Sequence, residues 1–150
     1  MKLIGSVACS IALCSLAAPA LGGLGGDAAS IHSDLVKMHG ALRVTAGAGF
    51  TVHEFTFASG TVVREYLSPD NRVFAVSWRG SGIPDLRQML GSYYDQYAQA
   101  PRTARRGDRH HLAVEQPGLV VQSSGHMRAF FGRAWAPDLL PRNFSIATID

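Results

Sequence analysis

The sequence predicts a single α+β domain: an antiparallel β-sheet of about six strands, in the order α-βββ-α-βββ, with two helices packed on one face. Three observations support this. The 150 residues are 47% hydrophobic and 17% charged, which suits one globular domain. Short apolar runs alternate with two segments of helical periodicity. The turns between the runs are too short for the crossover that parallel strands need, so neighbouring strands should be antiparallel.

The first 22 residues have the layout of a secretory signal peptide. Lys2 precedes an uncharged, largely apolar run that ends in Pro19 and small residues, as in leaders removed on export. A single membrane anchor is the alternative, but the proline and glycines end the run at about the minimum length of a span, roughly 17 residues. We therefore expect a signal peptide at 1–22 and one domain at 23–150. The mature chain should be periplasmic or secreted, with no transmembrane segment.

The composition argues against several classes of site and partner. Cys9 and Cys14 both lie in the expected leader, so the mature chain would have no disulfide, thiolate metal site or cysteine nucleophile. The net charge of +3 is small for a general nucleic-acid binder. The chain has no phosphate-binding loop, dinucleotide fingerprint, His-Glu-x-x-His or Gly-x-Ser-x-Gly motif. We expect no nucleic-acid partner, no metal, no cofactor and no assignable catalytic residue.

The first helix is expected at 27–39. Asp27 follows a glycine-rich segment and is a suitable N-cap. Apolar residues then recur three and four apart, as on one face of a helix, at Ile31, Leu35, Met38 and Leu42. Gly40, or the glycines at 47 and 49, should end it.

Three strands should follow as an antiparallel meander. Ser59-Gly60 is a turn signal, and the Ser68–Asn71 turn combines a proline with residues that tolerate unusual dihedral angles. In the last strand, Phe74, Val76 and Trp78 are expected to share one face. The predicted strands are 50–57, 61–67 and 72–78.

A second helix and three more strands are expected in the remaining sequence. Asp85 favours a helix start, and an apolar stripe then runs through Leu86, Met89, Leu90, Tyr93, Tyr94 and Tyr97. After a charged connector at 102–109, strands are predicted at 110–115, 119–123 and 127–135, and the tail at 136–150 should be a loop or short helix. The aromatic stripes, including Phe131 and Trp135, should meet the helices through Leu35, Met38, Leu90 and Tyr94. A spacing of 57 residues places Trp78 on Trp135, which suggests an internal repeat.

Several of these segments resemble one protein family. The longest is LVVQSSGHMRAFFGRA at 119–134, and shorter ones lie at Val63–Tyr66, Val73–Trp78 and Pro84–Arg87. They are similar to an uncharacterised family of exported proteobacterial proteins, labelled domain of unknown function 2844. The resemblance covers nearly the whole mature chain. It implies an exported bacterial domain and carries over no catalytic residue.

Four residues are candidates for a contact surface. His126 and Arg128 would share one face of a strand, where a cation beside a titratable imidazole could hold a carboxylate or phosphate. The alternative is an ordinary ion pair of Arg128 with an acid such as Glu65. Arg64 with Tyr66 would form a recognition patch, because both residue types are enriched at binding hot spots. The alternative there is a solvated surface.

Arg133 is a fifth binding candidate because it lies on an apolar-looking face. An isolated buried charge is very costly, so this arginine needs a partner. Glu65, Asp85 and Asp95 are the candidate acids, or the side chain extends past Trp135 to water.

The preferred functional hypothesis is an exported, non-catalytic binding or accessory protein of the cell envelope. Its partner would be an envelope protein or an anionic envelope component. One alternative is a small periplasmic enzyme that uses His126 with Asp85 or Glu65. Another is a small-ligand carrier whose pocket is lined by Tyr93, Tyr94, Tyr97 and Trp78.

Overall fold

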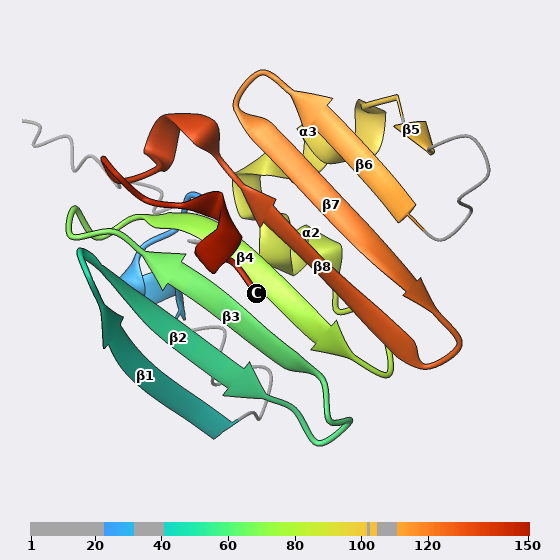
Figure 1. The fold of residues 1–150 in the computed structure, drawn as a ribbon, viewed down its shortest axis with the longest axis horizontal. Coiled ribbons are helices and arrows are strands. Elements are labelled where there is room, and N and C mark those ends of the chain that lie inside the picture. The colour runs from blue at the N-terminus through green and yellow to red at the C-terminus, as the bar shows by residue number, and fades with distance from the viewer. Residues whose placement is uncertain (1–22, 32–40, 102, 105–110) are drawn as a thin grey trace, which may run out of the picture.

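The computed structural model describes residues 23–31, 41–101, 103–104 and 111–150. Within them, the strands form one eight-stranded sheet in the order β1-β2-β3-β4-β8-β7-β6-β5 (Figure 1). Every neighbouring pair is antiparallel. The strands are β1 Ala41–Gly47, β2 Phe50–Thr56, β3 Val62–Leu67, β4 Val73–Gly80, β5 Thr103–Ala104, β6 His111–Gln116, β7 Leu119–His126 and β8 Ala129–Trp135. The predicted α+β class with an antiparallel sheet is confirmed, and most of the regular structure is β.

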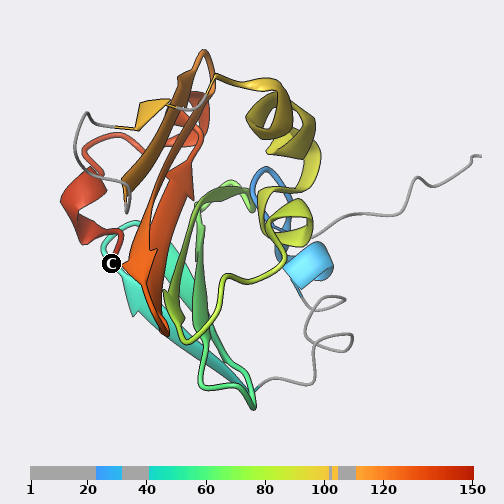
Figure 2. The ribbon, with the colours of Figure 1, turned by 90° about the vertical axis from the view of Figure 1, so that its right-hand side faces the viewer.

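Two faces of the sheet carry different parts of the chain (Figure 2). The helix face is covered by the helical residues 28–31 and by the short helices α2 Leu86–Leu90, η1 Gly91–Tyr93 and α3 Tyr94–Gln99. The tail face is crossed by residues 136–150, which include η2 Pro137–Leu139 and η3 Ile146–Thr148. Helices on one face and a tail with short helical turns are both as predicted.

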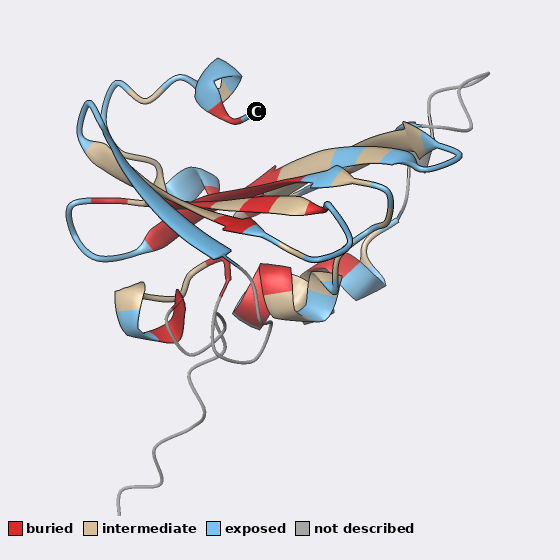
Figure 3. Ribbon diagram, turned by 90° about the horizontal axis from the view of Figure 1, so that it is seen from below, coloured by how far each residue is buried: buried red, intermediate tan, exposed pale blue. Residues whose placement is uncertain are grey.

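Apolar side chains pack against both faces. The helix-face cluster contains Phe55, Val63, Val76, Trp78, Leu90, Val121 and Ala134 among others. The tail-face cluster is smaller and contains Tyr66, Phe74, Ala75, Trp135 and Ile149, with Phe50 and Phe144 packed against it. Figure 3 shows the buried positions concentrated in the central strands and in the helical segments beneath them. The sheet is therefore the middle layer of the molecule.

A β-bulge in β4 divides the expected aromatic stripe between the two faces. Leu67 pairs with Val73 and Tyr66 with Ala75, so Phe74 is the extra residue. A bulge breaks the strict alternation of side chains. Phe74 therefore joins the tail-face cluster, whereas Val76 and Trp78 pack on the helix face.

The other predicted stripe also fails to meet the helices. Trp135 packs on the tail face, and Phe131 is 49% exposed. Of the four helix residues expected to receive the stripes, Leu90 and Tyr94 do pack in the helix-face cluster. Leu35 and Met38 lie outside the described residues.

The first helix was predicted correctly at its start. Asp27 accepts a hydrogen bond from the Ser30 N–H at 2.8 Å, and its own N–H donates to the Ser30 hydroxyl at 2.9 Å. This reciprocal pair caps the helical residues 28–31. The expected continuation to residue 39 falls outside the described part of the chain. Leu42 was wrongly assigned to that helix, because it lies in β1.

The second helix is interrupted rather than continuous. Asp85 caps α2 as predicted, since its carboxylate accepts from the N–H groups of Arg87 and Gln88. Gly91 then has φ +51°, and its N–H bonds back to the Arg87 carbonyl. This left-handed residue ends α2, so the chain continues through η1 into α3.

The β7–β8 hairpin turns later than predicted. The expected turn was at Ser124-Gly125, but β7 continues to His126, which pairs with Ala129. Met127 and Arg128 therefore form the turn, and Met127 is 92% exposed instead of lying in the core.

The two halves of the sheet share a strand order but not the proposed repeat. β1–β4 and β5–β8 are both meanders, and their last strands pair in the middle of the sheet. Trp78 packs on the helix face, however, and Trp135 on the tail face. If the two halves were repeats, the antiparallel pairing of β4 with β8 would place equivalent residues on the same face of the sheet. The 57-residue alignment therefore does not describe this fold.

Candidate functional site

A groove of about 790 Å³ lies on the tail face over β4, β8, β7 and β6. One side is bounded by Ile149 and Asp150 at the end of the tail. Arg79 and Phe131 come from the central strands, where alternation places them on the same face as Ser77 and Trp135. Polar residues that line the groove include Arg79, His111, Glu115, Gln122, Ser124, Arg133 and Asp150.

Arg79 and Arg133 place two guanidinium groups in the groove, and these differ in their hydrogen-bond partners. Arg79 is exposed at the end of β4, and its guanidinium has no hydrogen bond or ion pair with any other described residue. Arg133 is half-buried, and its Nε donates to Gln122 Oε1 at 3.0 Å. Its Nη1 donates to the carbonyls of Ile146 and Ile149, each at 3.3 Å.

Arg133 therefore takes neutral oxygen acceptors instead of the acid predicted from the sequence. Among the described residues, no carboxylate lies within ion-pair distance of it. Two of the three proposed acids are engaged on the helix face, because Glu65 is buried there and Asp85 caps α2. The guanidinium carbon lies 5.6 Å from the centroid of the Trp135 ring, which agrees with the alternative that this side chain extends past Trp135.

His111 and Ser124 face each other across β6 and β7. Their Nε2 and Oγ atoms are 3.3 Å apart, and the pair is exposed. A serine hydroxyl beside an imidazole is the first part of a nucleophile–base arrangement. Water competes for this contact because it is exposed, so the pair alone does not activate the hydroxyl.

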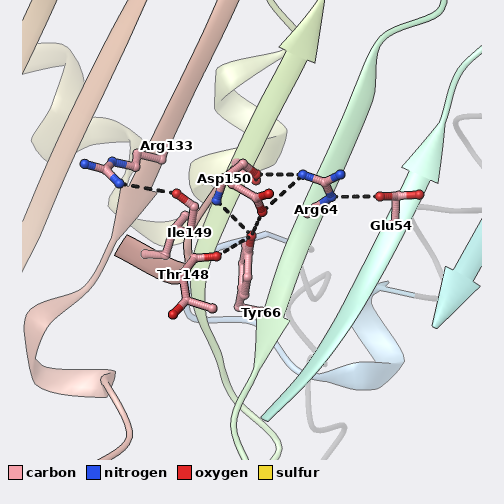
Figure 4. Close-up of polar contacts among 8 residues, drawn as sticks. Glu54, Arg64, Tyr66, Arg133, Thr148, Ile149 and Asp150 are labelled. Carbon is pink, nitrogen blue, oxygen red and sulfur yellow. Dashed lines mark hydrogen bonds and ion pairs between the residues drawn. The ribbon is translucent and has the colours of Figure 1, made fainter. Parts of the chain in front are cut away.

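The second polar cluster on this face surrounds Asp150 (Figure 4). Arg64 Nη1 donates to the Asp150 main-chain oxygen at 2.9 Å and lies 3.2 Å from its carboxylate oxygen Oδ1. The Ser77 hydroxyl donates to the same main-chain oxygen at 2.7 Å. The Tyr66 hydroxyl accepts from the Asp150 N–H at 3.2 Å and is 3.3 Å from Oδ1. Strands β3 and β4 thus hold several atoms of one residue.

Glu54 orients the arginine of this cluster. Glu54 and Arg64 are directly opposite in the β2–β3 hairpin, and Arg64 Nε donates to Glu54 Oε2 at 2.7 Å. This hydrogen bond is the main cause of the raised pKa of Arg64, to which the charge of Asp150 adds. Burial raises the pKa of the Tyr66 hydroxyl. Arg64 therefore stays charged and Tyr66 stays neutral near neutral pH.

A smaller groove of about 360 Å³ lies on the other side of the tail, over β1, β2 and β3. It is lined by Arg43, Phe50, Glu54, Arg64, Tyr66, Thr148 and Asp150 among others. Asp150 borders both grooves. Residues 148–150 consequently separate two hollows of one surface.

The five sequence-predicted binding residues fall into two groups. Arg64, Tyr66 and Arg133 all lie on the tail face and contact residues 146–150. His126 and Arg128 lie instead at the β7–β8 turn, where Arg128 has φ +67°. Arg128 is not on a strand beside His126 as expected, and its suggested ion pair with Glu65 does not form.

The residues of the enzyme alternative are not brought together. Glu65 is opposite Val76, whereas His126 lies beyond Gly80, four residues further along β4. That offset is roughly 13 Å by strand rise. Asp85 is occupied as the cap of α2.

The tyrosines proposed to line a carrier pocket pack against other apolar side chains. Tyr97 is buried in the helix-face cluster, and Tyr93 and Tyr94 pack against that cluster. Neither of the two grooves described above is lined by these tyrosines, although Trp78 borders the larger one.

Sequence reasoning missed several residues of both clusters. Glu54 could have been found, because the predicted β2–β3 hairpin brings it near Arg64 once the register is known. Arg79, Ser77 and Asp150 had no local signal, since their contacts join residues more than seventy positions apart or depend on the face of β4.

The described residues hold neither a candidate membrane-spanning helix nor a candidate metal site. None of their helices is long and apolar enough to cross a membrane. In the same part of the chain, no group of three or more histidine, cysteine, aspartate or glutamate side chains is placed to hold a metal ion.

Comparison with known proteins identifies the family. The model of the family described as "Protein of unknown function (DUF2844)" matches residues 20–149. The chain therefore belongs to this family, as its sequence motifs suggested. Searches of curated proteins and of solved structures gave no match.

Proposed function

We propose that this member of the DUF2844 family is an exported, non-catalytic binding protein of the cell envelope that holds an anionic ligand in the larger tail-face groove. One observation carries the proposal. The groove contains the guanidinium of Arg79, which has no partner among the described residues, together with that of Arg133. Guanidinium groups in a concave site favour carboxylate or phosphate through charge-assisted hydrogen bonds.

The state of Arg133 supports the same ligand chemistry. Its Nε and Nη1 are held by Gln122 and by two carbonyls, which fixes the plane of the guanidinium. Its Nη2 has no acceptor among the residues described. A pre-oriented donor loses little conformational entropy when a ligand binds. Arg79 would add a second, mobile charge.

Export is the second part of the proposal and rests on residues 1–22. The positive residue, apolar run and small residues in this segment have the order found in cleaved leaders. The ligand would then be an anionic envelope component, or an acidic group on an envelope protein. Cell fractionation followed by N-terminal sequencing of the native protein tests this part. A full-length protein retained with the cytoplasmic fraction would contradict it.

The groove is tested by titrating the purified protein with inorganic phosphate and with succinate while recording amide NMR spectra. We expect saturable shifts at Arg79, Ser124 and Arg133. The Arg79→Gln variant should weaken binding about fivefold, in line with about 1 kcal/mol for an exposed charged hydrogen bond.

Arg72→Gln is the matched control for this titration. Arg72 is an exposed arginine at the turn before β4 and does not line either groove. An equal loss of affinity in both variants would show only a net-charge effect. The absence of saturable shifts with either probe would reject the groove as an anion site.

A second candidate function, hydrolysis, is favoured by the contact between Ser124 and His111. Turnover of a small activated ester such as p-nitrophenyl acetate would test it. Ser124→Ala should abolish turnover if this serine is the nucleophile. Ser81→Ala is the control, because Ser81 is exposed and lines neither groove.

A further inference from the structure

We propose that Arg64, Tyr66 and Ser77 form a binding site for the acidic residue of an extended peptide from another protein, and that the chain's own Asp150 occupies this site in the structure. The site is separate from the anion groove proposed above, because Arg79 and Arg133 make no contact with the Asp150 carboxylate. We call Arg64, Tyr66 and Ser77 the acid site.

The acid site contacts main-chain and side-chain atoms of the same residue. Arg64 and Ser77 both donate to the main-chain oxygen of Asp150. Tyr66 accepts from its main-chain N–H. Arg64 and Tyr66 also lie within 3.3 Å of the side-chain oxygen Oδ1. A free anion would satisfy only part of this set, whereas an aspartate within a peptide satisfies all of it.

The residue before Asp150 adds an apolar requirement. Ile149 is 2% exposed and belongs to the tail-face cluster with Tyr66, Phe74 and Trp135. Burying an isoleucine side chain contributes about 1.5–3 kcal/mol. A competing peptide would therefore need an apolar residue directly before its acidic residue.

Asp150 itself is held at an exposed position. The Asp150 side chain is 74% exposed and that of Arg64 is 31% exposed. Ion pairs so accessible to water contribute little to stability, with a median of about 0–1 kcal/mol. The Asp150 ion pair alone therefore does not lock the segment in place, and the burial of Ile149 is the larger contribution that a competing peptide must match.

The grooves on either side provide room for a longer peptide. Residues 148–150 lie between the hollows of about 790 Å³ and 360 Å³, and Asp150 borders both. Figure 4 shows Arg64 and Tyr66 approaching this segment from one side and Arg133 from the other. Displacement of the segment would join the two hollows across the acid site.

The test uses a chain shortened to end at Phe144 and a fluorescein-labelled peptide with the sequence of residues 145–150, amidated at its C-terminus. Fluorescence anisotropy should show saturable binding to the shortened chain. The full chain should bind at least tenfold more weakly, because its tethered segment has an effective concentration of about 1 mM. The peptide carrying Asp150→Asn should bind the shortened chain about threefold to fivefold more weakly, because the exposed ion pair contributes up to about 1 kcal/mol.

Variants of the shortened chain assign the binding to the acid site. Arg64→Gln should lower the peptide affinity at least tenfold, and Arg72→Gln should leave it unchanged. In the full chain, phosphate binding in the larger groove should survive Arg64→Gln, so the two sites can fail separately. Peptide binding that ignores both Asp150→Asn and Arg64→Gln would overturn the proposal. A full chain that dimerises, and that Arg64→Gln returns to monomer, would overturn it in favour of exchange between copies.

Hydrogen exchange on the full chain tests whether residues 148–150 can leave the acid site, even if the shortened chain does not fold. The amides of Thr148, Ile149 and Asp150 should exchange through local opening, well before those of β4, and faster when the unlabelled peptide is added in excess. If they exchange only together with the β4 amides, the segment is a fixed part of the fold and the proposal is wrong.

Discussion

The two faces of the sheet are built from similar strands but have different chemistry. On the helix face, Val63, Val76, Trp78 and Val121 are all at most 2% exposed, and the helical segments cover them. On the tail face, an aromatic cluster lies beside two grooves and a set of arginine, tyrosine and acid contacts. The helix face therefore supports the fold, whereas the tail face retains exposed polar groups that a ligand can reach.

Removing Trp78 should have the largest effect on stability. Its ring is 2% exposed on the helix face and lies opposite Gly132, which has no side chain to fill the space. Trp78→Ala should lower the free energy of unfolding by about 3–5 kcal/mol through lost burial and a cavity. Phe131→Ala is the control, since Phe131 is 49% exposed. Urea unfolding should give it a loss below about 1 kcal/mol. Equal losses would remove the distinction between the faces.

Removing Phe144 should have a smaller effect, confined to the tail face. Its ring centroid lies 4.7 Å from that of Phe74 and 5.2 Å from that of Phe50, both with edge-to-face geometry. Because Phe144 is only half-buried, Phe144→Ala should cost about 1–2 kcal/mol. Hydrogen exchange should accelerate for residues 146–150 and not for α2 or α3. Acceleration in both places would mean that the faces unfold as one unit.

Local patterns predicted the helix face better than the tail face. Turn signals and period-two alternation located six of the strands, and Asp27 and Asp85 marked two helix starts. Edge strand β1 was missed because all its residues are exposed, so no buried stripe distinguishes it. The bulge at Phe74 and the turn at Met127 shifted side chains to faces that alternation does not predict.

The candidate site was even harder to predict from local sequence patterns than the tail face as a whole. Arg64 and Tyr66 were recognised from their residue types alone. Their contacts with Asp150 join positions 86 and 84 residues apart. Such contacts depend on where the tail crosses the sheet, and no short-range pattern encodes that path.

Alkaline pH should weaken the tail face before the helix face. Burial raises the pKa of Tyr66 above its ordinary value of 10.0. The folded state therefore holds this proton more tightly than the unfolded state, and the resulting stability is present below pH 10 and lost as the pH rises through the folded pKa. Tyr66→Phe should reduce this loss in unfolding experiments between pH 9 and 11. An unchanged slope would show that other groups cause it.

Mild acid should lower the stability of the helix face, and this effect should be smaller than those of the three predictions above. His53 lies on the face shared by Phe55, and its Nδ1 is buried without a hydrogen-bond partner among the described residues. Burial lowers the pKa of His53 below its ordinary value of 6.5. The unfolded state therefore takes up the proton first, so stability is complete above pH 6.5 and is lost as the pH falls through the folded pKa.

His53→Gln should reduce the change of the unfolding free energy with pH between pH 7 and 5. His126→Gln is the matched control at an exposed histidine of the β7–β8 hairpin. If the two variants respond alike, the acid sensitivity comes from exposed histidines and not from the helix face.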